Sequence, residues 1–329
     1  MKKIRWLSLS LAICTGCFSL SVSSQEAALN WPLKPIQIVS PFPPGGSDIP
    51  LRIQSAMVSE RTKWNFVIDY KPGASGAIAA GFVAKSAPDG YTHFVSSTSL
   101  ALTEILEHPV PFDGVKDFTP VYQLTRTQQV LVVNAALPVK SVQEYIAYAK
   151  ANPGTINFGL VGMTAQQRLV AEYMNETFGI RVNFVPYKGG AEVGTALVRG
   201  ELQASLQPRR NMLAGIKAGS IRPLGIASKN VRLKEIPGVI SIAEQGFPDF
   251  DYFSWTGLHA PAGTPDPVVT RINVEFNRVA SLPELHSKFE VTGEAVGGGS
   301  VEEFRKYYLA QRDRWVSVAK RIGIKLGAS

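Results

Sequence analysis

The sequence predicts an α/β fold of two lobes with a cleft between them. Strand-like and helix-like segments alternate along almost the whole chain, which is typical of layered α/β folds with largely parallel sheets. If a 24-residue leader is removed, 305 of the 329 residues remain, enough for two domains of about 150 residues each. Extended segments at 121–134 and after Phe247 are placed to cross between these domains. Two lobes joined in this way can close by a hinge motion.

The first lobe is expected to comprise residues 31–124 and 256–329, so that both ends of the mature chain build its core. Asp48 is expected to cap the first helix, because apolar residues recur at helical spacing after it. Ser300 and Glu303 have the capping-box spacing that opens a last amphipathic helix. The strands of this lobe are expected at 36–40, 66–69 and 93–97, with later helices near 267–280 and 283–291.

The second lobe is expected to comprise residues 125–255. Its first helix begins with Ser141 and Glu144 in capping-box spacing and stops at 152–154. Strands are expected at 157–161, 182–186, 202–206 and 224–227. Between them, glycines stand where helices would end: Gly179, Gly200 and Gly219.

Residues 1–24 have the three-part pattern of a secretory signal peptide. Three basic residues precede an apolar run over 6–20, and small polar residues follow as far as Ser24. The run is interrupted by hydroxyl residues and falls short of the ~20 apolar residues that span a membrane. The chain is therefore expected in the periplasm. A lipid-anchored form is the alternative, because Thr15-Gly16-Cys17 resembles the end of a lipoprotein box.

Charge and cysteine content exclude several classes of protein. Both cysteines, Cys14 and Cys17, lie in the leader, so a chain cleaved after Ser24 has no thiol, disulfide or cysteine-based metal site. The formal net charge of +8 includes +3 from the leader, which leaves +5. Since Lys and Arg are scattered rather than clustered, nucleic acid is not an expected partner.

Motifs for catalysis are missing from the sequence. The four histidines lack the spacing of zinc sites, and there is neither a G-x-S-x-G elbow nor a Walker loop. No catalytic residue, metal or cofactor is therefore expected. A secreted hydrolase on the same architecture remains the less favoured alternative.

Three loops that follow the first-lobe strands are small and polar, at 41–48, 71–76 and 96–99. Because the ends of neighbouring strands meet at one edge of an open sheet, these loops would form one rim of a polar pocket. Asp48 would occupy the free donors of the helix it caps, leaving the N–H groups of 45–47 for an anion. The alternative is that the glycines only form tight turns and the hydroxyls only cap helices.

Two second-lobe loops carry candidate cations. The loop at 185–190 repeats the order of strand, glycine loop and helix, and it contains Lys188. Arg209 and Arg210 follow another strand, where an arginine pair could form a bidentate clamp on a carboxylate. The alternative is that all three cations are simply solvated.

Taken together, these segments resemble the periplasmic receptors of tripartite tricarboxylate transporters, also called Bug receptors. The resemblance implies a two-lobed Venus-flytrap fold of the type II periplasmic binding class. It also implies a carboxylate ligand held mainly by backbone amides, hydroxyls and water. The matching stretches occur in order along nearly the whole mature chain: 31–36, 41–48, 72–76, 87–92, 116–121, 185–190, 217–224, 254–265 and 297–304.

Carried over position by position, the resemblance implies a set of ligand contacts in each lobe. The receptor is expected to be a monomer. A large and a small integral membrane protein would accept the ligand. The first-lobe contacts would be Phe42, Gly45, Gly46, Ser47, Asp48, Ser75, Gly76, Ser97 and Thr98. The second-lobe contacts would be Leu160, Met163, Thr164, Ala165, Tyr187, Gln207, Arg209 and Arg210.

The second lobe departs from the family pattern. Apolar residues replace a Ser/Gly-rich loop at 160–166, and Gln207-Pro208 replaces an Asp-Asn pair. We therefore expect an organic acid whose apolar or aromatic body faces Leu160 and Met163 and whose carboxylate faces Arg209 or Arg210. A sensory binding protein that presents its ligand to a membrane sensor would use the same cleft, and the sequence does not distinguish it from a transport receptor.

Overall fold

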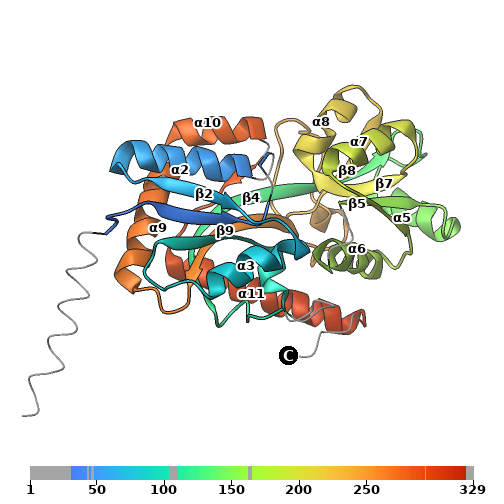
Figure 1. Cartoon of the computed structure of the whole chain (residues 1–329). Helices are drawn as coiled ribbons and strands as arrows, with labels where there is room; N and C mark the ends of the chain where they lie inside the picture. The colour runs from blue at the N-terminus through green and yellow to red at the C-terminus, as the bar shows by residue number, and fades with distance from the viewer. Residues whose placement is uncertain are drawn as a thin grey trace, which may run out of the picture.

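The computed structural model describes residues 31–42, 44–45, 48–103, 110–161, 165–292 and 294–323 (Figure 1). The predicted leader, Cys17 included, lies outside these residues. The strands are β1 (Ile36–Ser40), β2 (Phe66–Tyr70), β3 (Thr92–Ser97), β4 (Phe118–Asn134), β5 (Asn157–Val161), β6 (Asn183–Tyr187), β7 (Ala204–Pro208), β8 (Ile221–Ile226), β9 (Phe253–Pro261) and β10 (Ala295–Val296). The α-helices are α2 (Ile49–Thr62), α3 (Ala77–Ala84), α4 (Thr98–Ala101), α5 (Val142–Ala151), α6 (Ala165–Phe178), α7 (Gly190–Arg199), α8 (Arg209–Lys217), α9 (Asp266–Ala280), α10 (Pro283–Thr292) and α11 (Val301–Arg321); η2 (Ala74–Gly76) and η4 (Ala243–Gln245) are short 3-10 helices.

The first lobe is built on the parallel strands β2, β1 and β3, with β9 antiparallel to β3. Helices α2, α9 and α10 pack against one another over this part of the sheet, whereas α3 packs on β3. Ile36 and Ile38 of β1 are fully buried in the same core as Phe276 of α9. These apolar side chains therefore fix the strands whose ends carry the first polar loops.

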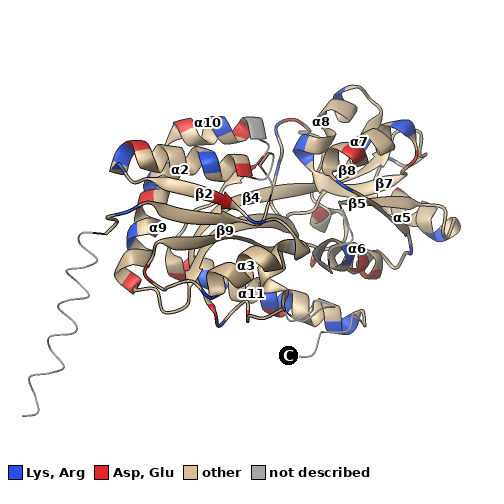
Figure 2. Ribbon diagram, in the orientation of Figure 1, with Lys and Arg blue, Asp and Glu red and all other residues tan. Residues whose placement is uncertain are grey.

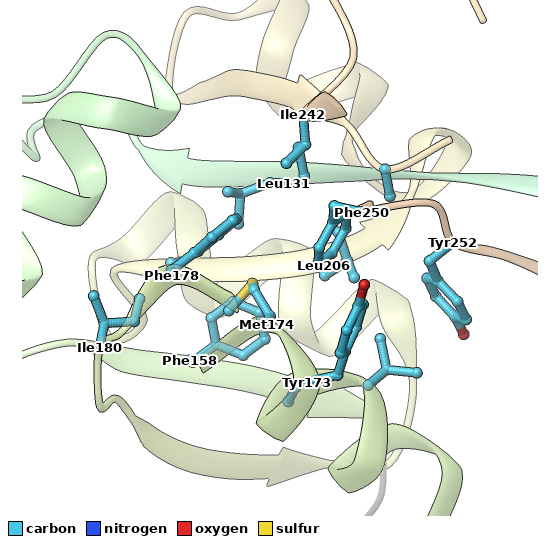
Figure 3. Close-up of a cluster of buried hydrophobic side chains, with 14 of the residues drawn as sticks. Leu131, Phe158, Tyr173, Met174, Phe178, Ile180, Leu206, Ile242, Phe250 and Tyr252 are labelled. Atoms are coloured by element: carbon cyan, nitrogen blue, oxygen red, sulfur yellow. The ribbon is translucent and has the colours of Figure 1, made fainter. Parts of the chain in front are cut away.

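The second lobe is built on β5, which pairs in parallel with β6 and β7. Helices α5 to α8 accompany these strands on the right of Figure 1. Figure 3 shows its core, in which Phe158, Met174, Phe178 and Phe250 meet from a strand, a helix and a later loop. The ring of Phe250 stacks on those of Tyr173 and Phe178, with centroids 5.3 and 5.7 Å apart.

Strand β4, 17 residues long, belongs to both lobes. Its first part pairs with β9 and β10, and its last part pairs with β7 and β8. The crossing predicted at 121–134 is thus observed as one continuous strand. The expectation of largely parallel sheets is wrong, because β4 and β9 run antiparallel to the strands that they join.

Helix α11 contacts both lobes, although the sequence placed it in the first lobe alone. The predicted capping box of Ser300 and Glu303 opens the helix. Farther along α11, the ring of Trp315 packs edge-on against the rings of Tyr173 and Tyr252, whose centroids lie 5.8 and 5.6 Å from its own. The C-terminal half of α11 therefore completes the core of the second lobe.

Candidate ligand-binding cleft

A cavity of about 670 Å³ opens between the two lobes. Small-molecule sites typically measure roughly 300–1,000 Å³, so a ligand of metabolite size fits this volume. The wall combines loops of both lobes with the two crossing strands β4 and β9. Among the residues predicted as ligand contacts, it includes Phe42, Gly45, Gly76, Ser97, Gln207 and Arg210.

The first-lobe wall is formed where β1, β2 and β3 end. Phe42 and Gly45 follow β1, Gly76 ends the 3-10 helix after β2, and Ser97 ends β3. Gly76 has a φ of 97°, and a Cβ there would lie 3.2 Å from the ring of Pro41, so this close approach of two loops requires glycine. The structure thus brings the three predicted loops to one rim.

Asp48 supports this rim from behind and does not cap the helix. Its side chain is fully buried and makes no cap hydrogen bond to α2. Instead its Oδ1 accepts from the Gly45 N–H at 2.8 Å, while its Oδ2 accepts from Tyr70 Oη at 2.6 Å and lies 3.3 Å from Arg52 Nε. The expectation that the Gly45 N–H is left for an anion is therefore corrected, because the Asp48 carboxylate already accepts that hydrogen bond.

The crossing strands form a polar floor whose residues were not among the predicted ligand contacts. Gln129 of β4 donates from Nε2 to Ser254 Oγ of β9 at 3.0 Å, and both line the cavity with Thr127 and Thr256. The sequence does contain a sign of this floor, because polar residues interrupt the otherwise apolar segment 121–134. In the sequence these residues are only the polar part of a predicted crossing strand, and they form the cavity floor only when β4 and β9 pair.

The second-lobe wall uses Lys188 from the loop after β6, Gly190 at the start of α7, and Gln207 from β7. A Cβ on Gly190 would lie 2.0 Å from Nδ2 of Asn211, so α7 and α8 approach closely here only because residue 190 is glycine. Gln207 donates from Nε2 to Ser205 Oγ at 3.1 Å and accepts from Asn211 Nδ2 at 3.4 Å through Oε1. These amides are held in place by neighbours within the lobe.

Each arginine of the predicted clamp pairs with a carboxylate of the protein. Arg209 Nη1 donates to Glu235, and Arg209 is not among the described residues that line the cavity. Arg210 lines the cavity and donates from Nη1 to Glu294. Burial raises the pKa of the Glu294 carboxyl above its usual range, and the Arg210 guanidinium opposes that effect.

The remaining predicted contacts lie elsewhere or outside the described residues. Leu160 is buried in the second-lobe core, because its position in β5 turns the side chain toward α6, so it does not form the expected wall. Thr98 is buried at the start of α4, and Tyr187 borders a separate shallow hollow of about 340 Å³. Gly46, Ser47, Met163 and Thr164 lie outside the described residues, and the side chains of Ser75 and Ala165 are also not described.

Two features are absent from the described residues. No group of three or more His, Cys, Asp or Glu side chains there is arranged to hold a metal ion. None of the described helices combines the length and the apolar character needed to cross a membrane.

Comparison with known proteins gives a consistent set of relatives. The family model described as "Tripartite tricarboxylate transporter family receptor" matches residues 51–324. Protein BugT of Bordetella pertussis is 30% identical over 308 residues, which covers 93% of this chain and 94% of that protein. A protein of Pseudomonas sp. strain P51, encoded in the tcbD-tcbE intergenic region, is 31% identical over 287 residues and covers 87% of this chain and 85% of its own.

Solved structures show the same likeness. R. palustris Rpa4515 with adipate has a TM-score of 0.78 and 33% identity, covering 90% of this chain and 99% of that one. MatC from Rhodopseudomonas palustris with bound malate has a TM-score of 0.74 and 26% identity, covering 88% and 99%. The periplasmic binding protein BugD, at 23% identity and a TM-score of 0.75, shares the fold.

Proposed function

Because this chain belongs to the family of tripartite tricarboxylate transporter receptors, we propose that it captures a small organic acid between its lobes and delivers it to a tripartite tricarboxylate-type transporter. Membership confirms the resemblance that the sequence motifs indicated, and with it the two-lobed periplasmic binding fold. The chain is a solute-binding receptor and not an enzyme.

The observation that carries the proposal is the chemistry of the cavity wall. Neutral hydrogen-bonding groups line the floor and the first-lobe rim, among them Gln129, Ser254 and Ser97. A carboxylate held by such groups keeps its charge, because several hydrogen bonds replace its hydration shell. The acids bound to two relatives, adipate and malate, support the same class of ligand.

The apolar body of the ligand would face the first lobe. Phe42, Leu100 and Phe112 line that side of the cavity, whereas Leu160 of the originally expected wall is in the core. These side chains would contribute about 25 cal/mol for each Å² of apolar surface removed from water. The carboxylate and the apolar body of the ligand contact both lobes at once only when the cleft is closed. Binding would therefore favour the closed state.

We also propose the cellular setting of the receptor. The leader at 1–24 would direct export, and the mature protein would act as a periplasmic monomer whose partners are a large and a small membrane subunit. The lobes would comprise residues 31–124 with 256–329, and residues 125–255. The mass of the mature N-terminus tests the export step, because a lipid on Cys17 would leave a longer, acylated chain.

A thermal-shift screen tests the ligand class. It would compare mono- and dicarboxylates, aromatic acids, amino acids and nicotinate-like compounds with sugars and cations as controls. A ligand present at about 100 times its Kd stabilises the native state by roughly 2.7 kcal/mol, which shifts Tm visibly. Stabilisation by sugars or cations alone would overturn the proposal.

A further inference from the structure

Three described residues on the cavity wall carry charge: Lys188, Arg210 and Glu294. Lys188 is exposed, so water screens its charge. The other two are more deeply placed, since the side chain of Arg210 is 28% exposed and that of Glu294 only 6%. The electrostatic character of the second-lobe end of the cavity is therefore set mainly by Arg210 and Glu294.

These two side chains pair across the cleft. Arg210 is in the first turn of α8, in the second lobe, whereas Glu294 lies between α10 and β10, in the first. Farther out, Lys234 Nζ and Glu290 Oε1 of α10 lie 2.6 Å apart and join the same two parts of the molecule. Figure 2 shows one acidic position near the C-terminal end of α10, which is Glu290.

The pairing changes what Arg210 can offer a ligand. An unpaired guanidinium at this place would attract a carboxylate, but Glu294 already supplies the opposite charge. A ligand carboxylate that approaches Arg210 also approaches Glu294, and two carboxylates in a partly dehydrated cavity repel each other more strongly than in water. A neutral group at that end of the ligand meets no such repulsion.

We propose that Glu294 is a specificity-determining residue: it neutralises Arg210 inside the cleft, so that the receptor selects acids with one carboxylate over acids with a second carboxylate at the second-lobe end. This inference rests on the proposed function, because it assumes that a carboxylate binds at the first-lobe rim. It gives the protein a ligand preference that differs from that of a dicarboxylate receptor.

The test compares hexanoate with adipate, and butyrate with succinate, by isothermal titration calorimetry. Each pair has the same number of carbons and differs in the second carboxylate. The wild-type protein should bind the monocarboxylate of each pair more tightly. Glu294→Gln should shift the ratio of the two Kd values toward the dicarboxylate by roughly tenfold, because Arg210 is then free to attract it.

Two further variants separate charge from space. Arg210→Gln combined with Glu294→Gln removes both charges, so the Kd ratio should return close to the wild-type value. Glu290→Gln alters the outer pair, whose Glu290 side chain is 63% exposed and outside the cavity, and it should leave the ratio unchanged.

The outcomes are distinct. Tighter binding of the dicarboxylate by the wild-type protein would overturn the inference without any variant, and so would an unchanged ratio in Glu294→Gln. If no carboxylate binds at all, the proposed function itself fails.

Discussion

Acidification from pH 7 to pH 5 should destabilise the native state through two buried histidines. His93 and His259 are almost completely buried, and burial lowers their pKa from 6.5 to about 4 and about 3, respectively. Ser96 Oγ donates to the carbonyl oxygen of Gly257, so it accepts from Nδ1 of His259, and Nε2 is left among aromatic rings. Protonation of Nε2 would place a cation there without a partner.

The sign and size of the effect follow from proton linkage. Below pH 6.5 the unfolded chain binds a proton at each histidine, whereas the native state does so only near its lowered pKa. Stability contributed by the neutral histidines is thus complete above pH 6.5 and is lost as the pH falls toward 4. At pH 5 the loss is about 2 kcal/mol per histidine, or ~4 kcal/mol for both.

Urea unfolding at several pH values, without ligand, measures this loss directly. The wild-type protein should lose stability steadily between pH 7 and 5, and His93→Gln combined with His259→Gln should flatten that dependence whatever its absolute stability. A wild-type free energy of unfolding that changes by less than ~1 kcal/mol over this interval would refute the reasoning. The same pH dependence in the double variant would refute it as well.

Three other substitutions have defined outcomes. Gly190→Ala should displace Asn211 on the cleft wall and weaken ligand binding by roughly tenfold, or about 1.4 kcal/mol, in calorimetry. Gly238→Ala is the control and should bind normally, because a Cβ there would meet nothing within 4 Å and Gly238 is not among the described residues that line the cavity. Asp48→Asn should lower the free energy of unfolding in urea by about 2 kcal/mol and weaken ligand binding, because the carboxylate accepts hydrogen bonds from two donors behind the rim. An unchanged ligand affinity in this variant would show that Asp48 does not hold the rim in its binding conformation. Trp315→Ala should lower the free energy of unfolding by about 3–5 kcal/mol in the same assay, because this buried ring joins α11 to the second lobe. A decrease of less than ~1 kcal/mol would show that α11 does not complete the second-lobe core.

Local features of the fold were predictable from the sequence. The capping box at Ser300, the strand at 36–40 and the crossing at 121–134 depend on residues close together in the chain, so their patterns are visible without a structure. The family motifs likewise identified the first-lobe loops, because each loop is one short segment.

Features that depend on distant residues were not predictable. Glu294 lies 84 residues from Arg210, and no local pattern connects them, so the arginines looked available for a ligand. Asp48 has the position of a helix cap, but Tyr70, 22 residues away, and the Gly45 N–H compete for its carboxylate. The side of β5 on which Leu160 lies is likewise fixed only by packing against α6.

The continuity of β4 sets the mechanics of this receptor. A loop between lobes could swing freely, but here separation of the lobes has to bend a hydrogen-bonded ribbon. Strand β4 changes partners between Gln128, which pairs with Phe253 of β9, and Gln129, which pairs with Pro208 of β7, and bending is easiest where pairing is interrupted. We therefore expect the stiffness of β4 at this change of partners to limit how wide the cleft can open and, with it, the size of the acid that can enter.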